Sequence, residues 1–300
     1  MFDEILSLLA YRVMITPKTG FLVSQGTLPL SPTEPDISFM RCEVPGVGAL
    51  PYIPGSSLKG PFRAHGEALL RSLSHNTNAR FACDIGHNSA CSQSIDFKRL
   101  SGKEKYLKIC YACRTYGCLG VASVIRFEDA YPWRVPEEAE AIYKNLEERV
   151  MVRNGISVDR NSGKVKEGAL FFYESVNLPF YSQIFLKNPE IWQVALFLKT
   201  IEHINEGFQK FGHSKSRGMG RVEIVPTELT VYTKGRNGLL FRTSTNNTEG
   251  ALEKAIEGID LTDDRWLRKS AVSGDRLKAV NDALLREGID QLLRQTKQVG

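Results

Sequence analysis

Four cysteines in the first half of the chain have the types and spacing of a metal site. Cys110 and Cys113 form a Cys-x2-Cys pair, and Cys83 and Cys91, separated by seven residues, can supply a second pair. Four thiolates are the ligand set of a structural zinc site, which is closed and leaves no coordination position for a substrate. We therefore expect Zn2+ to hold this segment together and to take no part in catalysis.

Alternatives remain for this cysteine cluster. His87 lies between Cys83 and Cys91 and can replace one thiolate, whereas Cys118 is expected to be a free, packed thiol. Disulfides are the competing explanation, but a cytoplasmic chain of this length neither needs nor readily keeps them. A redox role for the Cys-x2-Cys pair is the other alternative. Such a pair would instead be expected after a strand and at the start of a helix, in a thioredoxin-like pattern.

Residues 53–63, Ile-Pro-Gly-Ser-Ser-Leu-Lys-Gly-Pro-Phe-Arg, combine a glycine turn, two serines and two cations. Ser56 or Ser57 is expected to cap a helix that starts here. Lys59 and Arg63, four residues apart, then lie on one side of that helix. Because the free N–H groups and dipole of a helix N-terminus attract anions, this segment predicts a phosphate-binding site. An ordinary capped helix with solvated charges is the alternative.

A second basic segment, residues 211–221, places small residues between cations just before a predicted strand. Residues 207–222 contain no acid at all, and glycines allow a backbone to approach its ligand closely. Lysine and arginine there suit phosphate oxygens, in contacts that are salt-sensitive and independent of base sequence. With residues 53–63, this segment favours a nucleic-acid ligand over a solvated turn. The predicted contacts are His213, Lys215, Ser216, Arg217 and Arg221.

The elements that must position these residues alternate between strands and helices. Their order is strand, helix, strand, inserted hairpin, strand, helix, strand, which is that of a ferredoxin-like (RRM-like) domain of the α+β class. The expected strands are 11–15, 123–133, 169–176 and 219–231, the last of them interrupted at Pro226. The expected helices are 57–73 and 188–208, the second from the apolar spacing of Ile191, Val194 and Ile201, and a charged helix is expected over 136–150.

We expect residues 1–235 to form this ferredoxin-like domain. It carries a zinc-binding insertion at about 74–121 and a thumb hairpin at about 145–170. The irregular stretch 20–54 is a place to search for chemistry, because long loops in compact domains are often functional. Residues 246–300 are predicted to be a helical extension, interpreted as a packing tail.

Composition predicts a globular chain with a proper core, since 42% of its 300 residues are hydrophobic. The net charge of +5 is mild, so its basicity is local. Asp3 and Glu4 stand where a secretory signal would have cations, and no apolar run approaches the roughly 20 residues of a membrane span. A cytoplasmic location is the resulting expectation.

The two basic segments carry a family resemblance. Residues 53–63 resemble the Ile-Pro-Gly-Ser-Ser-Leu-Lys-Gly-x-x-Arg signature of the RAMP superfamily, and residues 216–220 resemble its C-terminal glycine-rich loop. The stretch 110–117, Cys-Tyr-Ala-Cys-Arg-Thr-Tyr-Gly, looks like the zinc-bearing element of backbone subunits in type III CRISPR effector complexes, and residues 153–160 are similar to their thumb. The likeness covers about residues 8–232.

This resemblance implies an antiviral-defence ribonucleoprotein. Its backbone subunits polymerise along a CRISPR guide RNA beside other effector subunits, and each thumb wedges into the duplex of guide and target RNA. In catalytic members, a loop aspartate promotes target RNA cleavage. Asp36 matches that place, and Glu34 and Glu43 are the alternatives. The implied activity is an endoribonuclease (a hydrolase) that uses Mg2+ or another divalent cation. The alternative is a non-catalytic guide-RNA scaffold or capping subunit. Guide-RNA processing is less attractive, because no histidine lies near the loop in sequence.

Overall fold

The computed structural model describes residues 4–26, 34–73, 80–84, 88–234, 240–242, 247–249, 262–264 and 267–297. Helices and antiparallel sheets share these residues, which confirms the predicted α+β class. The elements are β1 (Ser7–Pro17), β2 (Arg41–Val44), β3 (Gly48–Pro51), α1 (Gly55–Ser72), α2 (Cys91–Ser94), α3 (Gly102–Lys108), α4 (Tyr111–Tyr116), β4 (Ile125–Phe127), η1 (Pro136–Glu138), α5 (Ala139–Lys144), η2 (Glu147–Arg149), β5 (Val150–Val158), β6 (Val165–Val176), β7 (Phe180–Lys187), α6 (Ile191–Glu206), η3 (Lys215–Arg217), β8 (Val222–Thr233), β9 (Leu240–Arg242), β10 (Asn247–Glu249), β11 (Thr262–Asp264), β12 (Leu267–Ser273) and α7 (Gly274–Lys297).

Six strands form the main sheet, in the order β11-β12-β8-β1-β7-β4, and each neighbouring pair is antiparallel. The central strand β1 alternates between buried and more exposed residues, and Leu9, Tyr11, Val13 and Ile15 are all buried. Because successive side chains of a strand point to opposite faces, these four apolar residues lie on one face of the sheet. The hydrophobic core lies against that face of the sheet.

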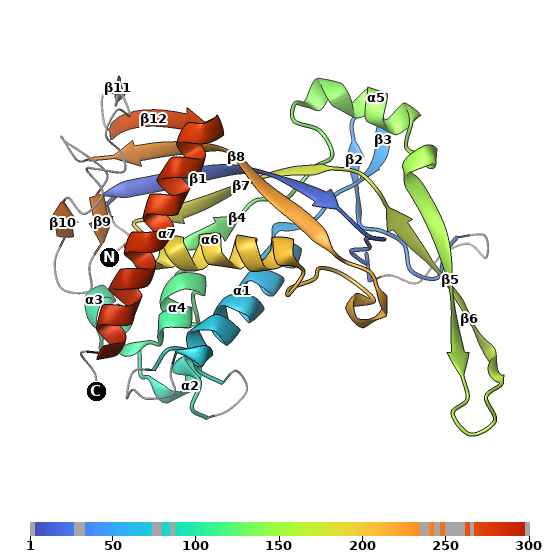
Figure 1. Cartoon of the computed structure of the whole chain (residues 1–300), viewed down its shortest axis with the longest axis horizontal. Helices are drawn as coiled ribbons and strands as arrows, with labels where there is room; N and C mark the ends of the chain where they lie inside the picture. Colours follow the sequence, from blue (N-terminus) through green and yellow to red (C-terminus); the bar gives the residue numbers. More distant parts are fainter. Residues whose placement is uncertain are drawn as a thin grey trace.

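Helices α1, α6 and α7 cover this face of the sheet (Figure 1). The Tyr11 ring lies 5.2 Å from that of Phe197 in α6, and its hydroxyl hydrogen-bonds Asn281 Oδ1 of α7 over 3.0 Å. On α1, the Phe62 ring lies 4.9 Å from that of Phe127 in β4. These contacts place all three helices against one apolar core.

The segment between α1 and β4 contains the short helices α2, α3 and α4. Helix α3 begins with a capping box, in which the side chains and backbone N–H groups of Ser101 and Glu104 bond each other. The buried Tyr106 hydroxyl donates to Glu190 Oε1 at the start of α6 over 2.6 Å. This bond fastens the insertion to the helical layer.

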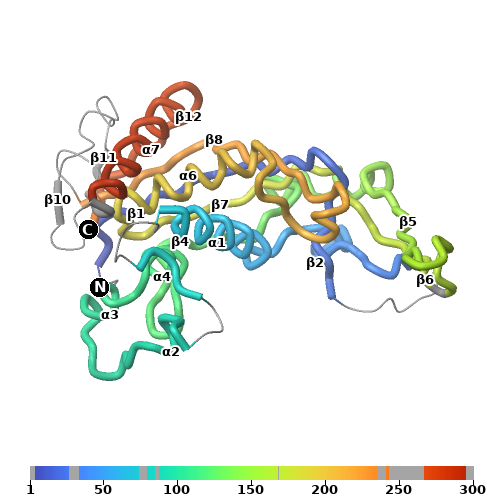
Figure 2. The backbone as a smooth tube through the Cα atoms, turned by 60° about the horizontal axis from the view of Figure 1, so that its bottom comes forward, coloured from blue at the N-terminus to red at the C-terminus, as the bar shows by residue number. Residues whose placement is uncertain are grey.

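Strands β5 and β6 form a separate two-stranded hairpin that projects from the body of the molecule (Figures 1 and 2). Ile156 and Leu170 face each other across it, and their side chains are 55% and 54% exposed. A hairpin is present where the thumb is predicted, although its strands reach from Val150 to Val176, beyond the expected 145–170 at one end.

The C-terminal part of the chain is not only helical, in contrast to the prediction. Strand β12 pairs with β8 and so extends the main sheet, and α7 follows it and packs on α6. At Gly288 of α7, an added Cβ would lie 2.5 Å from the Ala195 Cβ of α6. The helices therefore approach closely there, and residues 267–297 are an integral layer of the fold.

Two other expectations need correction. The charged helix predicted over 136–150 is three short pieces, η1, α5 and η2. The strand expected to be interrupted at Pro226 continues from Val222 to Thr233, because a register shift opposite Arg12 and Val13 accommodates the proline. Among the described residues, no helix has the length and apolar character needed to cross a membrane.

Candidate metal centre and nucleic-acid interface

The four predicted zinc ligands come together in the structure. Cys83, Cys91, Cys110 and Cys113 are all buried, and their Sγ atoms lie within 4.8 Å of one another, so the group could hold a metal ion. The Sγ atoms of Cys83 and Cys113 are 3.7 Å apart. Zinc–sulfur bonds of about 2.3 Å in a tetrahedron require a sulfur–sulfur separation of about 3.8 Å, so this donor set fits zinc. His87 lies outside the described residues, and Cys118 is not part of the group.

Backbone N–H groups point at this cluster. The Cys110 N–H donates to Cys91 Sγ over 3.2 Å, and the Cys113 N–H donates to Cys110 Sγ over 3.4 Å. The Cys110 side chain thereby caps α4, whose sequence begins one residue later. Such donors stabilise thiolate charge, which suits cysteines that bind a cation.

Arg63 faces the cysteines. Its Nε donates to Glu67 over 2.8 Å, its Nη1 to the Gly117 carbonyl over 3.2 Å, and its Nη2 lies 4.0 Å from Cys113 Sγ. The side chain is only 25% exposed. Its charge thus lies beside the thiolates, which gives Arg63 a structural role that its position in the phosphate-binding motif did not suggest.

The start of α1 differs from the prediction. Neither Ser56 nor Ser57 caps the helix, because Pro54 is the N-cap residue and Gly55 begins the first turn. The Gly55 N–H donates to the carboxylate of Asp129 over 2.7 Å, so an acid from beyond β4 takes the place of the expected serine. A Cβ on Gly55 would lie 2.4 Å from the Phe127 carbonyl oxygen. Only glycine allows this close approach to β4.

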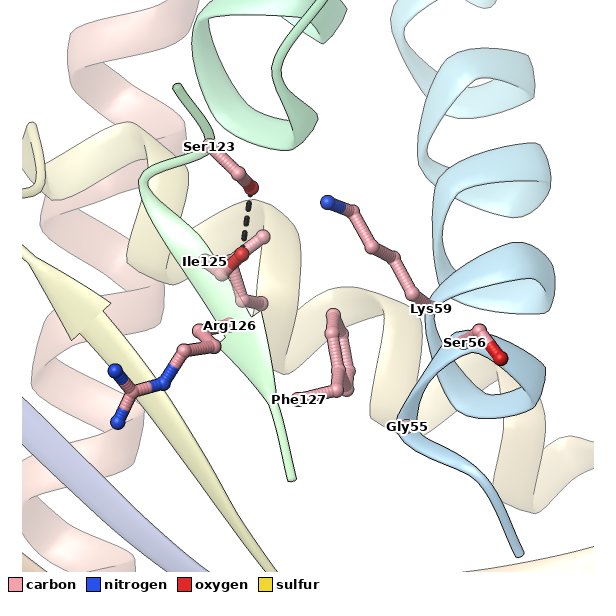
Figure 3. A pocket seen from close by; sticks show the side chains of 7 residues that line it. All are labelled: Gly55, Ser56, Lys59, Ser123, Ile125, Arg126 and Phe127. Carbon is pink, nitrogen blue, oxygen red and sulfur yellow. Dashed lines mark hydrogen bonds between the residues drawn. The ribbon is translucent and has the colours of Figure 1, made fainter. Parts of the chain in front are cut away.

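A hollow of about 280 Å³ lies beside this helix start (Figure 3). Ser56 and Lys59 of α1 line it together with Ser123 and residues 125–127 of β4, and the Lys59 side chain points toward Ser123. Partial burial, and then the charge of Arg63, lower the pKa of Lys59. A phosphate oxygen in this hollow would meet a serine hydroxyl and a partly desolvated ammonium group.

In the glycine-rich loop after α6, residues 211–221, two glycines with positive φ lie close to other backbone atoms. Gly212 has φ +73° and Gly220 φ +80°, and a Cβ would lie 2.0 Å from the Leu22 carbonyl oxygen at the first and 2.1 Å from the Phe211 carbonyl oxygen at the second. The loop buries Phe211 and Met219. Its predicted contacts Lys215, Ser216, Arg217 and Arg221 are exposed.

Two ring contacts connect this loop with its surroundings. Phe211 packs edge-on against Phe62 of α1, with ring centroids 6.3 Å apart, so the loop lies next to the helix that carries Ser56 and Lys59. On its other side, the His213 ring lies 6.4 Å from the ring of Tyr173 in β6. The loop therefore connects the α1 region with the base of the projecting hairpin, and a histidine lies closer to the Asp36 loop than sequence order suggests.

Asp36 is exposed and lies at the base of this hairpin. The backbone of Ile37 pairs in parallel with that of Tyr173. The Ile37 N–H donates to the Phe172 carbonyl over 3.2 Å, and the Ile37 carbonyl accepts the Glu174 N–H over 2.9 Å. The Phe172 N–H donates to Asp36 Oδ2 over 2.6 Å. Both the backbone and the carboxylate of the loop are thus fixed by β6.

A buried acid secures the same loop. Glu174 is 5% exposed and accepts the Phe39 N–H over 2.6 Å, while Arg41 binds both of its carboxylate oxygens. The sequence shows no signal for this clamp, because its two charged residues are 133 positions apart in the chain. The bond from the Phe172 N–H to Asp36 and the pairing of Tyr173 with Ile37 were likewise not predicted.

Residues 44–223 match the family model of the RAMP superfamily, which is more than half of the chain, so this chain belongs to the RAMP superfamily. Proteins of this superfamily bind RNA and work in multi-subunit complexes, and the RAMP domain indicates a CRISPR-associated RNA-binding subunit. The matched segment includes the α1 start, the cysteine cluster, the hairpin and the glycine-rich loop. No curated protein matches the sequence.

Proposed function

We propose that this protein is a guide-RNA-binding backbone subunit of a type III CRISPR interference complex, and that it cleaves complementary target RNA. Membership of the RAMP superfamily supports RNA binding within a complex. The arrangement of the hairpin, the Asp36 loop and the basic surface supports the more specific role. The observation that carries the cleavage proposal is the placement of the Asp36 carboxylate at the hairpin base by the Phe172 N–H.

A ferredoxin-like core belongs to this proposal. Strands β8, β1, β7 and β4 lie in that order and alternate in direction, and α1 and α6 follow the first and third of them in the chain. This is the arrangement expected when two β-α-β units form one antiparallel sheet. The β5–β6 hairpin then corresponds to the insertion between the second and third core strands.

The guide backbone would lie along the surface from the α1 start to the hairpin base. Ser56 and Lys59 provide the first contacts, the exposed cations of the glycine-rich loop continue the path, and His213 ends it beside Tyr173. Charges and hydroxyls bind phosphates without reading bases, so base pairing with the guide would supply specificity. Zinc would stabilise the insertion beside α1 through the four cysteines.

Cleavage would require a target nucleotide to be kinked at the hairpin base. The ribose 2′-oxygen then lies in line with the neighbouring phosphorus, so that the bond from O2′ to phosphorus forms as the bond from phosphorus to O5′ breaks. The 2′-hydroxyl would give its proton to water and the departing O5′ would take one from water, which leaves a 2′,3′-cyclic phosphate and a 5′-hydroxyl end. Asp36 would orient the 2′-hydroxyl or help to bind a divalent cation. Such a cation would neutralise charge that develops on the phosphate. Among the described residues, the cysteines are the only cluster of three or more potential ligand side chains, so RNA oxygens would have to complete the coordination.

Cleavage by the reconstituted complex tests this proposal. We would follow cutting of a guide-complementary RNA with Mg2+ for wild type and Asp36→Ala, and measure target binding separately in EDTA. Lost cutting with retained binding supports the nuclease. Intact cutting by the variant rejects Asp36, and tight binding without cutting by wild type identifies a scaffold or capping subunit.

A further inference from the structure

The face of the main sheet opposite the three helices carries aromatic rings. Its side chains come from the alternate strand positions that do not enter the core, and they form rows across the strands. In one row, Phe185 of β7 lies beside Ala10 and opposite Arg126 of β4. In another, Tyr232 of β8 lies between Leu8 and Lys269. In a third, Tyr181 lies beside Met14 and pairs with Tyr131.

A cation lies over the face of each of the three rings Phe185, Tyr181 and Tyr232. The Arg126 guanidinium lies 4.5 Å from the Phe185 centroid, the Arg134 guanidinium 4.8 Å from that of Tyr181, and Lys269 Nζ 5.5 Å from that of Tyr232. Arg126 points away from the hollow beside Lys59 (Figure 3). Residue 126 thus lines the hollow, but its guanidinium lies on the side away from Lys59.

The aromatic series continues beyond the sheet. The Tyr131 ring stacks on Tyr52, with centroids 5.9 Å apart, and on Trp133, with centroids 4.8 Å apart. Along β7, Phe185 and Tyr181 are four residues apart, about 13 Å at the rise of a strand. Rings thus recur across the sheet and along it, at intervals that extended nucleotides can span.

Charge on this face favours an anion. Glu128, Glu228 and Glu223 on this face are each paired with a cation, namely Arg126, Arg12 and Lys18. The Arg126 and Arg12 side chains are 68% and 63% exposed. Arg134 and Lys269, which lie over the rings of Tyr181 and Tyr232, are two further cations on the same face. Guanidinium planes and aromatic rings both stack on unpaired bases, and the cations complement phosphates.

We propose that this face is a stacking platform for single-stranded RNA, formed by Phe185, Tyr181 and Tyr232 with Arg126, Arg134 and Lys269. Stacking needs bases that are free of pairing, so the expected ligand is an unpaired stretch and not the guide–target duplex. The inference rests on the proposed function only in that the protein binds RNA. It adds a second binding surface, on the side of the sheet opposite α1.

Binding of a ten-nucleotide oligouridine to the full-length protein, measured by fluorescence anisotropy over a range of salt concentrations, tests the platform. Phe185→Leu with Tyr181→Leu keeps apolar bulk but removes two rings, and it should weaken binding at least about tenfold. A duplex of the same length should bind equally to both proteins. Tyr143→Leu, a 44% exposed tyrosine on α5, is the matched control and should change binding less than twofold. Thermal unfolding of each variant checks that the fold is kept.

A second measurement does not depend on the variants. Photocross-linking of wild type with 4-thiouridine RNA should label peptides that contain Tyr181, Phe185 or Tyr232. Unchanged affinity of the double variant together with labels confined to residues 207–222 would overturn the platform and leave the proposed function standing. Loss of duplex and single-strand binding in Lys59→Ala with Arg217→Ala, but not in the double variant, would also overturn it. A wild type that binds no RNA rejects both proposals.

Discussion

Asp36, in the loop before β2, and Phe172, in β6 of the hairpin, are joined by a hydrogen bond of 2.6 Å from the Phe172 N–H to Asp36 Oδ2. The donor is part of the backbone of the projecting hairpin. Any movement of that strand therefore carries the carboxylate with it, and this couples the predicted catalytic group to the element that would meet the RNA duplex.

The charge of Asp36 and its position can be separated by substitution. Asp36→Asn keeps an oxygen that accepts the Phe172 N–H but removes the negative charge. We expect cleavage to fall at least about 10²-fold, with target binding and thermal stability unchanged. Single-turnover cleavage rates measure this. Glu34→Gln and Glu43→Gln are the matched controls and should cleave at the wild-type rate; if one of them is inactive instead, that residue is the catalytic acid.

Removing the Glu174 clamp should loosen the Asp36 loop. Glu174→Gln breaks the ion pair with Arg41, whose side chain is 26% exposed, and we expect the free energy of unfolding to fall by about 1–3 kcal/mol. Urea denaturation measures the change. Glu140→Gln breaks a pair with Lys144 in which both side chains are about two-thirds exposed, and it should leave the urea midpoint essentially unchanged. Equal losses would show that the clamp adds nothing.

Two glycines of the same loop should respond differently to alanine. Gly212 and Gly218 both have positive φ, but a Cβ on Gly212 would lie 2.0 Å from the Leu22 carbonyl oxygen, whereas no heavy atom lies within 4 Å of one on Gly218. Gly218→Ala should cost about 1–2 kcal/mol for its backbone conformation alone. Gly212→Ala should cost at least about 2 kcal/mol more, because backbone must move. Urea denaturation midpoints of the two variants measure this difference. Similar losses of stability in Gly212→Ala and Gly218→Ala would mean that the loop backbone shifts readily.

Zinc should be measurable in the purified protein. We expect one zinc per chain by elemental analysis, and Cys113→Ser should lower both zinc content and Tm. A Tm loss of roughly 5 °C or more is expected, since about 2–4 °C corresponds to 1 kcal/mol in large domains. Cys42→Ser and Cys118→Ser lie outside the four-sulfur group and should retain the metal. Full stability of a zinc-free protein would contradict a structural role.

Acid should weaken the contact between α1 and α6. His65 Nε2 lies 2.9 Å from His203 Nδ1, so one ring must donate and the other accept. Partial burial, and then His203, lower the pKa of His65. The unfolded chain then binds a proton more readily, so stability is complete above the ordinary histidine pKa of about 6.5 and falls as pH drops through it.

Urea midpoints at pH 8 and pH 5 measure this acid effect. The decrease should be smaller for His65→Gln, which cannot titrate, than for wild type. His213→Gln is the control, and its decrease should match that of wild type. An equal decrease in all three proteins would assign the acid sensitivity to other groups.

Sequence reasoning succeeded where a local pattern determines the structure. The apolar spacing of Ile191, Val194 and Ile201 predicted α6, and Gly207 ends that helix with φ +90°. The pairing of Cys83 and Cys91 with Cys110 and Cys113 was predicted from spacing, because a shared cation requires thiols to converge. The resemblance to the RAMP superfamily was recognised from residues 53–63 and 216–220, and the match of residues 44–223 to the family model confirms it.

The failures concern contacts between distant residues. Asp129 caps α1 from 74 positions away, and no local signal marks a cap that comes from another element. Arg63 has the spacing of a phosphate ligand, but Glu67 and the cysteines determine where its side chain points. Residues 267–273 were predicted as part of a helical extension, and they form a strand because β8 offers an unpaired edge.

The position of β12 has a consequence during synthesis on the ribosome. Strand β8 already pairs with β1 on one side, but its partner on the other side is encoded more than thirty residues later. A nascent chain that has released β8 but not residues 267–273 presents an open edge, which is a template for pairing with a neighbouring chain. Slow translation through the intervening segment would prolong that exposure, so yield in a cell should depend on how quickly β12 emerges.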